Sequence, residues 1–184
     1  MNKETLKSVL QQFRDRKLPE VYRRNVQIPT DSGKVISLVG ARRTGKTFIL
    51  FQIMHDLLAH GITREQIIYL NFEDDRLYPV DAGELDLILR AHSELYPEAA
   101  RKKRYVFFDE LQNVADWERY VRRIYDTEHV SIFLTGSSSS MLRRDVSTAM
   151  RGRTVVFEIF PLSFAEFLSF NNLEYTPYST ASEA

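Results

Sequence analysis

The chain has 184 residues, 43% of them hydrophobic and 27% charged, a size that forms one ordinary hydrophobic core rather than two. Cysteine is absent, which excludes disulfides and thiolate metal sites, and 25 basic residues balance 25 acidic ones, so no global field attracts nucleic acid. No apolar run approaches bilayer length and the start lacks a signal-peptide core, so we expect a cytoplasmic protein without a membrane partner.

The first predicted element is an amphipathic helix that ends before Pro19. Its apolar residues recur with the i, i+3, i+4, i+7 spacing of one helix face: Leu6, Val9, Leu10 and Phe13. We expect this face to pack on the core that follows, and we treat residues 1–20 as an N-terminal helical segment. The pair Arg23-Arg24 comes next and is expected to be solvated, unless the fold places it beside the site described below.

A phosphate-binding loop follows the apolar run Val35–Val39, which predicts a buried strand. The loop reads Gly40-Ala41-Arg42-Arg43-Thr44-Gly45-Lys46-Thr47 and satisfies G-x-x-x-x-G-K-[ST] at every fixed position. Its glycines let several backbone amides converge on one anion at the start of a helix. Lys46 would then reach the β- and γ-phosphates, and the Thr47 hydroxyl would bind Mg²⁺. The alternative is a plain glycine turn with an exposed lysine.

The candidate nucleotide-binding residues are the loop and the position after it: Gly40, Ala41, Arg42, Arg43, Thr44, Gly45, Lys46, Thr47 and Phe48. From Thr47 to about His60 the sequence is apolar on nearly every side, which predicts a helix buried all round and ended by Gly61. Ile67–Phe72 predicts a second strand. The acids Glu73-Asp74-Asp75 at its carboxyl end could position water or metal, although an exposed acidic turn explains them at least as well.

A second chemical landmark follows a helical pattern over Ala82–Leu95 and a basic run at Arg101–Arg104. The run is expected to be solvated, with nucleic-acid contact as the alternative. The short apolar strand Tyr105–Phe108 then delivers Asp109 and Glu110 to its carboxyl end. The first acid can hold Mg²⁺ through its waters, opposite the phosphate loop. The second can polarise a water for attack on a γ-phosphate.

A fourth strand is predicted over Val130–Thr135, after a helix with Asp116 as its expected N-cap and Trp117 as a core anchor. Thr135 and Ser137 stand at the tip of this strand. A small hydroxyl there could hydrogen-bond the attacking water or the γ-phosphate and report the nucleotide state. An ordinary serine-rich turn is the alternative.

Two arginines precede the fifth predicted strand, Thr154–Ile159, after a short helix and loop over Met141–Met150. Arg151 or Arg153 could face phosphate, from the same subunit or from a neighbour in a homo-oligomer, and stabilise the transition state. A solvated basic turn is the alternative. The last predicted helix, Pro161–Phe170, has an apolar side made of Leu162, Phe164, Phe167 and Leu168.

With these motifs in view, the chain resembles the predicted ATPases of the AAA superfamily that are related to archaeal ATPases. The resemblance rests on the phosphate loop and, in order after it, on Asp109-Glu110-Leu111-Gln112, Thr135-Gly136-Ser137-Ser138 and Arg151-Gly152-Arg153. It implies an α/β fold of the P-loop NTPase class, a three-layer sandwich with a central, mainly parallel five-stranded sheet. An inserted strand would separate the loop-bearing strand from the acid-bearing strand.

The resemblance also implies ATP and Mg²⁺ as cofactors and ATP hydrolysis as the activity. By position it gives the metal to Thr47 and Asp109. Thr135 or Ser137 resembles the polar sensor, and one of the two arginines resembles the residue that completes the site. The catalytic candidates are Glu110 as the base, together with Lys46, Thr135, Ser137, Arg151 and Arg153.

We therefore expect an ATPase core over residues 21–170 and a linker or disordered tail over residues 171–184. Members of the family usually continue into a C-terminal domain, so a longer parent protein is expected. One alternative function is a nucleotide-dependent switch with negligible turnover that regulates an unknown protein partner. Another is a nucleic-acid-dependent ATPase that acts through Arg101–Arg104 or Arg23-Arg24, and a small-molecule kinase is a further option. GTP is disfavoured because no N-K-x-D tetrapeptide occurs.

Overall fold

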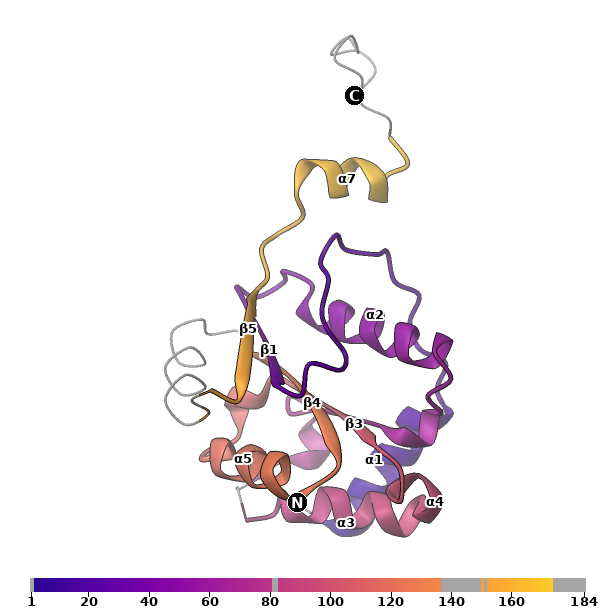
Figure 1. The fold of residues 1–184 in the computed structure, drawn as a ribbon, viewed down its shortest axis with the longest axis vertical. Helices are drawn as coiled ribbons and strands as arrows, with labels where there is room; N and C mark the ends of the chain where they lie inside the picture. The colour runs from indigo at the N-terminus through magenta and orange to yellow at the C-terminus, as the bar shows by residue number, and fades with distance from the viewer. Residues whose placement is uncertain (1, 81–82, 137–149, 151, 174–184) are drawn as a thin grey trace, which may run out of the picture.

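The computed structural model describes residues 2–80, 83–136, 150 and 152–173, which form an α/β sandwich (Figure 1). The strands are β1 (Val35–Val39), β2 (Ile67–Asn71), β3 (Arg104–Asp109), β4 (Val130–Gly136) and β5 (Thr154–Glu158). The helices are α1 (Lys3–Asp15), α2 (Lys46–Ala59), α3 (Asp86–Leu95), α4 (Pro97–Ala100), α5 (Trp117–Thr127) and α7 (Phe164–Phe170). Short 3₁₀ turns are η1 (Arg64–Gln66), η2 (Asp75–Leu77) and η3 (Leu111–Asn113). None of the helices in the described part of the chain is long and apolar enough to cross a bilayer.

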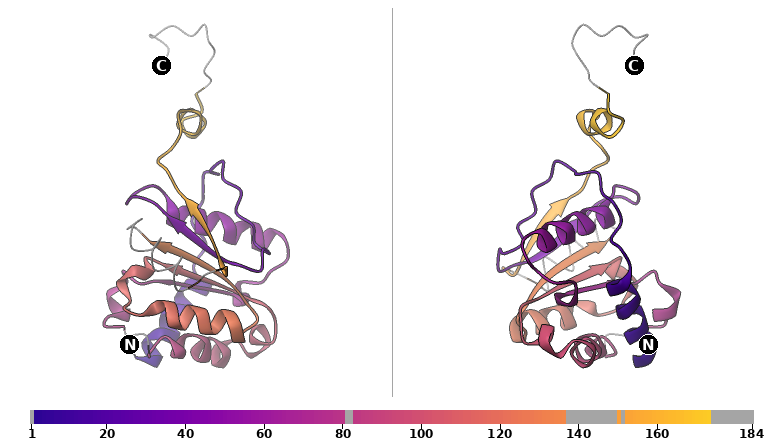
Figure 2. Two further views of the ribbon diagram at one scale, coloured as in Figure 1. Left: turned by 60° about the vertical axis from the view of Figure 1, so that its left-hand side comes forward. Right: turned by 90° about the vertical axis from the view of Figure 1, so that its right-hand side faces the viewer.

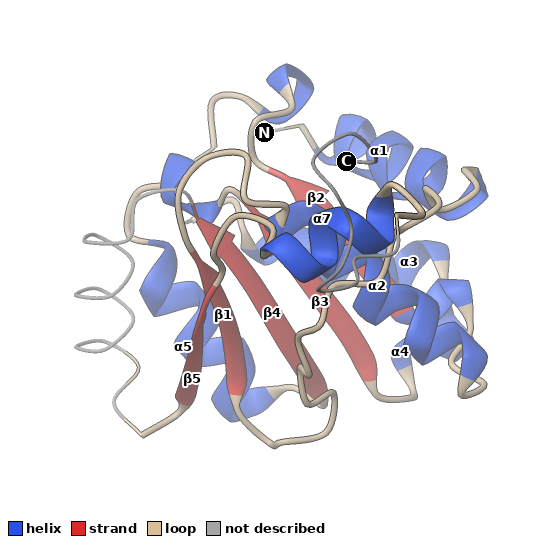
Figure 3. Cartoon of the chain, turned by 90° about the horizontal axis from the view of Figure 1, so that it is seen from above, coloured by secondary structure: helices blue, strands red, loops and turns tan. Residues whose placement is uncertain are grey.

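The strands lie in the order β2-β3-β4-β1-β5, and every neighbouring pair is parallel (Figure 3). The predicted inserted strand is therefore confirmed, because β4 separates β1 from the acid-bearing strand β3. In the register, Val39 at the end of β1 lies opposite Gly136, and Asn71 lies opposite Asp109. The carboxyl ends of these strands meet at one edge of the sheet, where open parallel sheets bind ligands.

Helices cover both faces of the sheet, as the two views of Figure 2 show. α2 packs on one face, in a cluster that includes Ile36, Leu38 and Phe107. α3 and α5 pack on the other face, in a cluster that includes Phe108. Adjacent residues of one strand thus serve different layers, which is why these strands read as continuous apolar runs.

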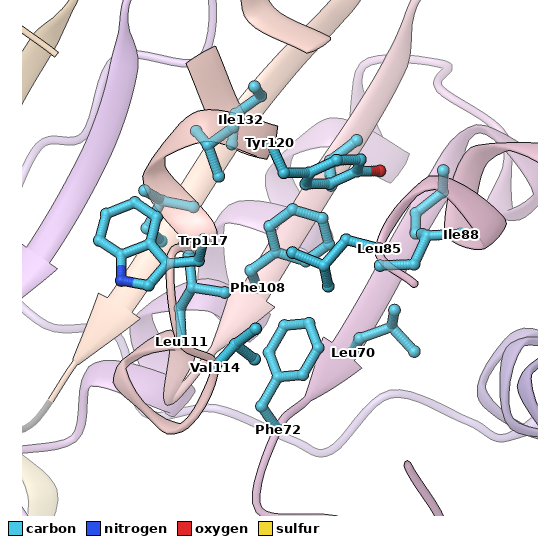
Figure 4. Packing of buried hydrophobic residues seen from close by; sticks show 14 of the residues in the cluster. Leu70, Phe72, Leu85, Ile88, Phe108, Leu111, Val114, Trp117, Tyr120 and Ile132 are labelled. Carbon is cyan, nitrogen blue, oxygen red and sulfur yellow. The ribbon is translucent and has the colours of Figure 1, made fainter. Parts of the chain in front are cut away.

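The cluster under α3 and α5 is centred on Phe108 of β3 (Figure 4). Its ring centroid lies 5.6 Å from that of Phe72 and 6.2 Å from that of Tyr120. Trp117 is only 4% exposed, so the prediction that it anchors the core is confirmed. The buried face of α1 joins the same cluster through Leu6, Val9 and Leu10, as its spacing predicted.

Two local predictions about helix starts need correction. Asp116 is the N-cap residue of α5, as predicted, but its side chain makes no cap hydrogen bond, and its backbone is left-handed with φ 53°. The helix is held instead by its buried apolar face. Phe48, expected to be buried in the apolar helix α2, is 53% exposed, because it lies at the helix start beside the phosphate loop.

Helix α7 stands apart from the sheet, at the end of an extended segment that follows β5 (Figure 1). It begins at Phe164 rather than at the predicted Pro161, and none of its residues is buried. Phe164 and Phe167 are 64% and 50% exposed, so the predicted apolar side does not face the core. Ser163 and Glu166 form a capping box that fixes the start of this helix.

Arg24 connects α7 to the phosphate loop. Its Nε donates to Glu166 Oε1 at 2.7 Å, and only 12% of each of these side chains is exposed. Its two terminal nitrogens donate to the carbonyl oxygens of Thr44, at 2.9 Å, and Phe160, at 3.0 Å. Its backbone N–H donates to Gln52 Oε1 at 2.9 Å. The arginine that was expected to be solvated is therefore a clasp, because its planar fork can serve several acceptors at once.

Replacing Phe107 by Ala tests the packing between β3 and β4. The buried ring stacks on Phe133 with centroids 4.7 Å apart, so Phe107→Ala should lower the free energy of unfolding by about 3–5 kcal/mol. Urea denaturation measures this change. The matched control is Phe160→Ala, whose ring is 64% exposed and which should cost less than about 0.5 kcal/mol. Equal losses in the two variants would contradict the assigned core.

Replacing Arg24 by Gln tests the clasp. The hydrogen bond from Arg24 is the main cause that lowers the pKa of Glu166 from 4.5 to about 2. Arg24→Gln should move this pKa back toward 4.5, as measured by NMR titration of the side-chain carboxyl carbon. Arg23→Gln removes the neighbouring ion pair to Asp56 and should leave the Glu166 pKa unchanged. A Glu166 pKa that ignores Arg24 would show that the clasp does not form.

The same shift gives the attachment of α7 a pH dependence. Because the Glu166 pKa is lower in the folded state, its stabilising effect is complete above about pH 4.5 and is lost as the pH falls toward 2. Amide exchange in α7, corrected for the intrinsic rate, should therefore accelerate as the pH is lowered through this window. The Arg24→Gln chain should show no such step.

Candidate functional site

The loop after β1 depends on glycine at two positions. Gly45, immediately before α2, is left-handed with φ 88°. A Cβ placed on Gly40 would lie 2.3 Å from the carbonyl oxygen of Ile159, which excludes any side chain there. The Thr44 hydroxyl donates to the Ala41 carbonyl at 3.0 Å and closes the turn. Backbone amides at the start of a helix have no partner within the helix, so the loop presents donors to an anion.

Lys46 is buried inside this loop, with 4% of the residue exposed. Its Nζ donates to the carbonyl oxygens of Gly40 at 3.1 Å and Ala41 at 2.8 Å. Burial lowers the pKa of Lys46, and the negative charges of Glu110 and Asp109 act in the opposite direction. The alternative of an exposed lysine on a plain turn is therefore wrong, and the ammonium group lies within electrostatic reach of both predicted acids.

Asp109 is completely buried at the end of β3, and both of its carboxylate oxygens accept hydrogen bonds from hydroxyl groups. The Thr135 hydroxyl on β4 donates to Oδ1. The Tyr69 hydroxyl on β2 donates to Oδ2 at 2.9 Å, and burial raises the pKa of Tyr69, so this hydroxyl remains a donor. The two neighbouring strands thus fix the orientation of the carboxylate.

Thr135 bridges the two predicted acids. While its hydroxyl proton goes to Asp109, its Oγ1 accepts the backbone N–H of Glu110 at 2.9 Å. We predicted that the Thr135 hydroxyl could donate to a water or to the γ-phosphate. In the structure it donates to Asp109 instead. The residue instead holds Asp109 and Glu110 in a fixed relation.

Glu110 follows β3 in a left-handed conformation, with φ 53°, which is uncommon for a residue that is not glycine. Such strain tends to occur at functional positions. Gln112 Nε2 donates to Glu110 Oε2 at 2.5 Å. The carboxylate of the predicted base is therefore held by a side chain two residues further along.

The residues fit a magnesium nucleotide. Mg²⁺ takes oxygen ligands, commonly one or two side chains together with substrate phosphates, and Thr47 and Asp109 are donors of that kind. An ammonium group has three N–H donors. The described partners of Lys46 are the two loop carbonyls, which leaves one N–H for a phosphate. The loop amides suit the remaining phosphate oxygens.

A cavity of about 480 Å³ opens beside the loop and suits a nucleoside in size. Its lining includes Arg43, Thr44 and Phe48 of the loop and the start of α2, together with Tyr22 and Phe170. The Tyr22 and Phe170 rings lie 5.1 Å apart. A larger cavity of about 600 Å³ lies between α1 and Tyr69, and the loop does not line it.

The structure places Arg153 away from the loop of its own chain. Its carbonyl accepts the N–H of Val35 at the start of β1, and its Nε donates to Asp126 Oδ1 at 3.0 Å. Because β1 and β5 are parallel, Arg153 lies at the amino edge of the sheet, opposite the edge that carries the loop. The predicted contact of Arg153 with phosphate in the same subunit is therefore wrong. Arg151 and Ser137 lie outside the described residues, as does the predicted short helix and loop over Met141–Met150 except for Met150 itself.

The basic run before β3 makes internal ion pairs. Arg104 is 5% exposed and donates to Glu128 Oε2 at 2.7 Å, so the expectation of a solvated run is wrong at this residue. Lys103 pairs with Asp31 at 2.6 Å. These pairs leave less free positive charge for nucleic acid than the run alone suggested.

Sequence reasoning missed Tyr69 and Glu166, and it named Arg24 only in a pair expected to be solvated unless the fold placed it beside the site, as the fold does. Tyr69 did carry a signal, because strand alternation puts it on the same face as Asn71, which lies opposite Asp109. That signal needs the strand register, which the sequence does not state. Arg24 and Glu166 are 142 positions apart, and no local pattern links them.

Two solved structures share similarity with the chain. The structure of AMPPCP-bound DnaA from Aquifex aeolicus aligns over 94% of this chain and 51% of that one, with 15% identity and a TM-score of 0.47. The structure of C. elegans PCH-2 aligns over 98% of this chain and 50% of that one, with 13% identity and a TM-score of 0.48. At these scores nothing further follows for this chain.

Three relatives are more similar in sequence, and all are uncharacterized proteins. One from Methanocaldococcus jannaschii is 37% identical over 169 residues, which cover 91% of this chain and 36% of that protein. One from Haemophilus influenzae is 36% identical and covers 79% of this chain and 35% of that protein. A second from M. jannaschii is 30% identical and covers 77% and 29%. The chain spans about a third of the length of these curated relatives.

The family match includes the site described above except Phe170 and the segment that carries Tyr22 and Arg24. The family described as AAA domain matches residues 32–168, which include the phosphate loop, the acids of β3 and the tip of β4. The strand order, with β4 inserted between β1 and β3, agrees with the fold that the sequence predicted. On this evidence the chain belongs to the AAA domain family of nucleotide-binding, ATPase-like proteins.

Proposed function

We propose that the chain binds Mg-ATP and hydrolyses it to ADP and phosphate. The observation that supports this most is the position of the Lys46 ammonium group. It is buried within the phosphate loop, and the charges of Glu110 and Asp109 act on it from the end of β3. A cation inside an anion-binding loop, with two acids close enough for their charges to act on it, is an arrangement that suits phosphoryl transfer.

In this proposal Lys46 and the loop amides hold the phosphates, and Thr47 and Asp109 hold Mg²⁺. The metal, when bound, neutralises charge on the phosphate oxygens. Glu110 orients a water for in-line attack on the γ-phosphorus and accepts its proton, while ADP leaves with the bridging oxygen. Thr135 holds Asp109 and Glu110 in a fixed relative position through its two hydrogen bonds. Positioning and electrostatic stabilisation supply most of the rate.

One observation favours a second candidate, a nucleotide-dependent switch with negligible turnover. The Glu110 carboxylate accepts a hydrogen bond from Gln112, which competes with the water that the base must orient. A switch would bind nucleotide and keep this bond. Steady-state phosphate release separates the two candidates, because only the ATPase releases phosphate continuously.

Replacing Glu110 by Gln tests the assignment of the base. Glu110→Gln should bind ATP with an affinity within about twofold of the parent chain and reduce turnover by roughly 10²–10⁴-fold, since the amide cannot accept the proton. Fluorescent-nucleotide binding and phosphate release measure the two effects. Glu73→Gln is the control, because its charge also acts on Lys46 but it lies beyond β2. If the Glu73 variant rather than the Glu110 variant stops turnover, the base is wrongly assigned.

Mixing two variants tests whether an arginine acts between subunits. Arg153 cannot reach its own loop in this structure, so we propose that any contribution it makes is to a neighbouring subunit. Arg153→Ala and Glu110→Gln chains should each be inactive alone and recover part of the parent turnover when mixed. Asp126→Asn, which breaks the Arg153 ion pair, should keep turnover. An Arg153→Ala chain as active as the parent would exclude this role.

A further inference from the structure

The Tyr69 hydroxyl is the contact of Asp109 that no sequence motif accounts for. Tyr69 lies on β2, 40 positions before Asp109, and its OH donates to Asp109 Oδ2 at 2.9 Å. The other oxygen, Oδ1, is taken by Thr135. Asp109 has no exposed surface, so these two hydroxyl donors define how its carboxylate is turned. Loss of either would leave a buried carboxylate oxygen without that bond, which is costly.

The Tyr69 ring is held in place by two other aromatic rings. Its centroid lies 4.9 Å from that of Phe13 on α1 and 5.4 Å from that of Phe51 on α2. All three rings also line the cavity of about 600 Å³ beneath α1. Helices α1 and α2 therefore fix the Tyr69 ring, and its hydroxyl contacts Asp109. A phenylalanine at this position would keep the ring packing and lose only the hydroxyl.

The simpler explanation is that this hydrogen bond only satisfies the polar end of a tyrosine that packs against the core. Tyr120 shows that a tyrosine of this fold can lack such a bond. Tyr120 is buried, 4% exposed, whereas Tyr69 is partly buried, and the Tyr120 hydroxyl has no hydrogen-bond partner among the described residues. The direct contact of the Tyr69 hydroxyl with the carboxylate assigned to the metal is thus a specific feature of the site.

We infer that Tyr69 is a positioning residue for the metal site, whose hydroxyl orients the Asp109 carboxylate so that it can hold Mg²⁺ at the phosphate loop. This inference rests on the proposed function, because it assumes that Asp109 serves a magnesium nucleotide. Partners that orient metal-binding groups typically change metal affinity or activity by about 10–100-fold when they are removed. The hydroxyl therefore contributes to metal binding rather than to chemistry on the phosphate.

The test compares Tyr69→Phe with Tyr120→Phe in the full chain. Each variant removes one hydroxyl and keeps the ring, so circular dichroism and the melting temperature should show folded proteins. Binding of a fluorescent ATP analogue is measured over a magnesium titration and again in EDTA. In Tyr69→Phe the Mg²⁺ concentration for half-maximal effect should rise by about tenfold or more, while metal-free binding stays within about twofold of the parent. Tyr120→Phe should match the parent in both.

A second variant and a rate measurement complete the test. Thr135→Val removes the donor to the other oxygen of Asp109 and should shift the magnesium curve in the same direction. This variant tests the orientation of Asp109 independently if the Tyr69 variant folds poorly. Excess Mg²⁺ should restore phosphate release in Tyr69→Phe if the parent hydrolyses ATP.

The two proposals fail in distinguishable ways. A parent chain that binds no nucleotide overturns both. A parent that binds Mg-ATP without turnover contradicts hydrolysis alone, because the magnesium curves still report on Tyr69. A Tyr69→Phe curve identical to that of Tyr120→Phe overturns the role of Tyr69 alone.

Discussion

A buried ammonium group that faces two carboxylates is the interaction on which this site depends. Removing Lys46 from water carries a cost that the loop carbonyls of Gly40 and Ala41 offset only in part. The acids at the end of β3 supply the opposite charge. Their placement depends in turn on β4, which sets the spacing between the loop and the acids. The strand order is therefore part of the electrostatics of the site.

The acids themselves are held by groups from other strands. Thr135 of β4 and Tyr69 of β2 place a hydroxyl on either oxygen of Asp109, and Thr135 also receives the N–H of Glu110. Three neighbouring parallel strands, β2, β3 and β4, thus meet in one small network. A parallel sheet brings such groups together because all its strands end at the same edge. The aromatic packing of Tyr69 links this network to α1 and α2.

The clasp of Arg24 joins parts of the chain that the sheet does not. One guanidinium group serves Thr44 in the loop and Glu166 in α7, so the position of this helix and the shape of the loop depend on each other. Helix α7 buries none of its own residues, and the Arg24–Glu166 bond and the ring contact between Phe170 and Tyr22 hold it. The exposed rings of Phe164 and Phe167 lie on this helix. Phe170 of α7 also contacts Tyr22, and both rings line the cavity of about 480 Å³ beside the phosphate loop.

The sequence by itself determined the phosphate loop, the strand that carries Asp109 and Glu110, and the order of strands and helices along the chain. These features are local, since glycine spacing and apolar periodicity act over a few residues. Only the tertiary structure decided that Tyr69 and Thr135 share one carboxylate and that Arg24 reaches Glu166. It also decided that Arg153 lies at the far edge of the sheet and that Phe48 is exposed. Such contacts depend on strand register and join residues that are far apart in the sequence. Local patterns span only a few residues, so they do not specify which distant residues will meet.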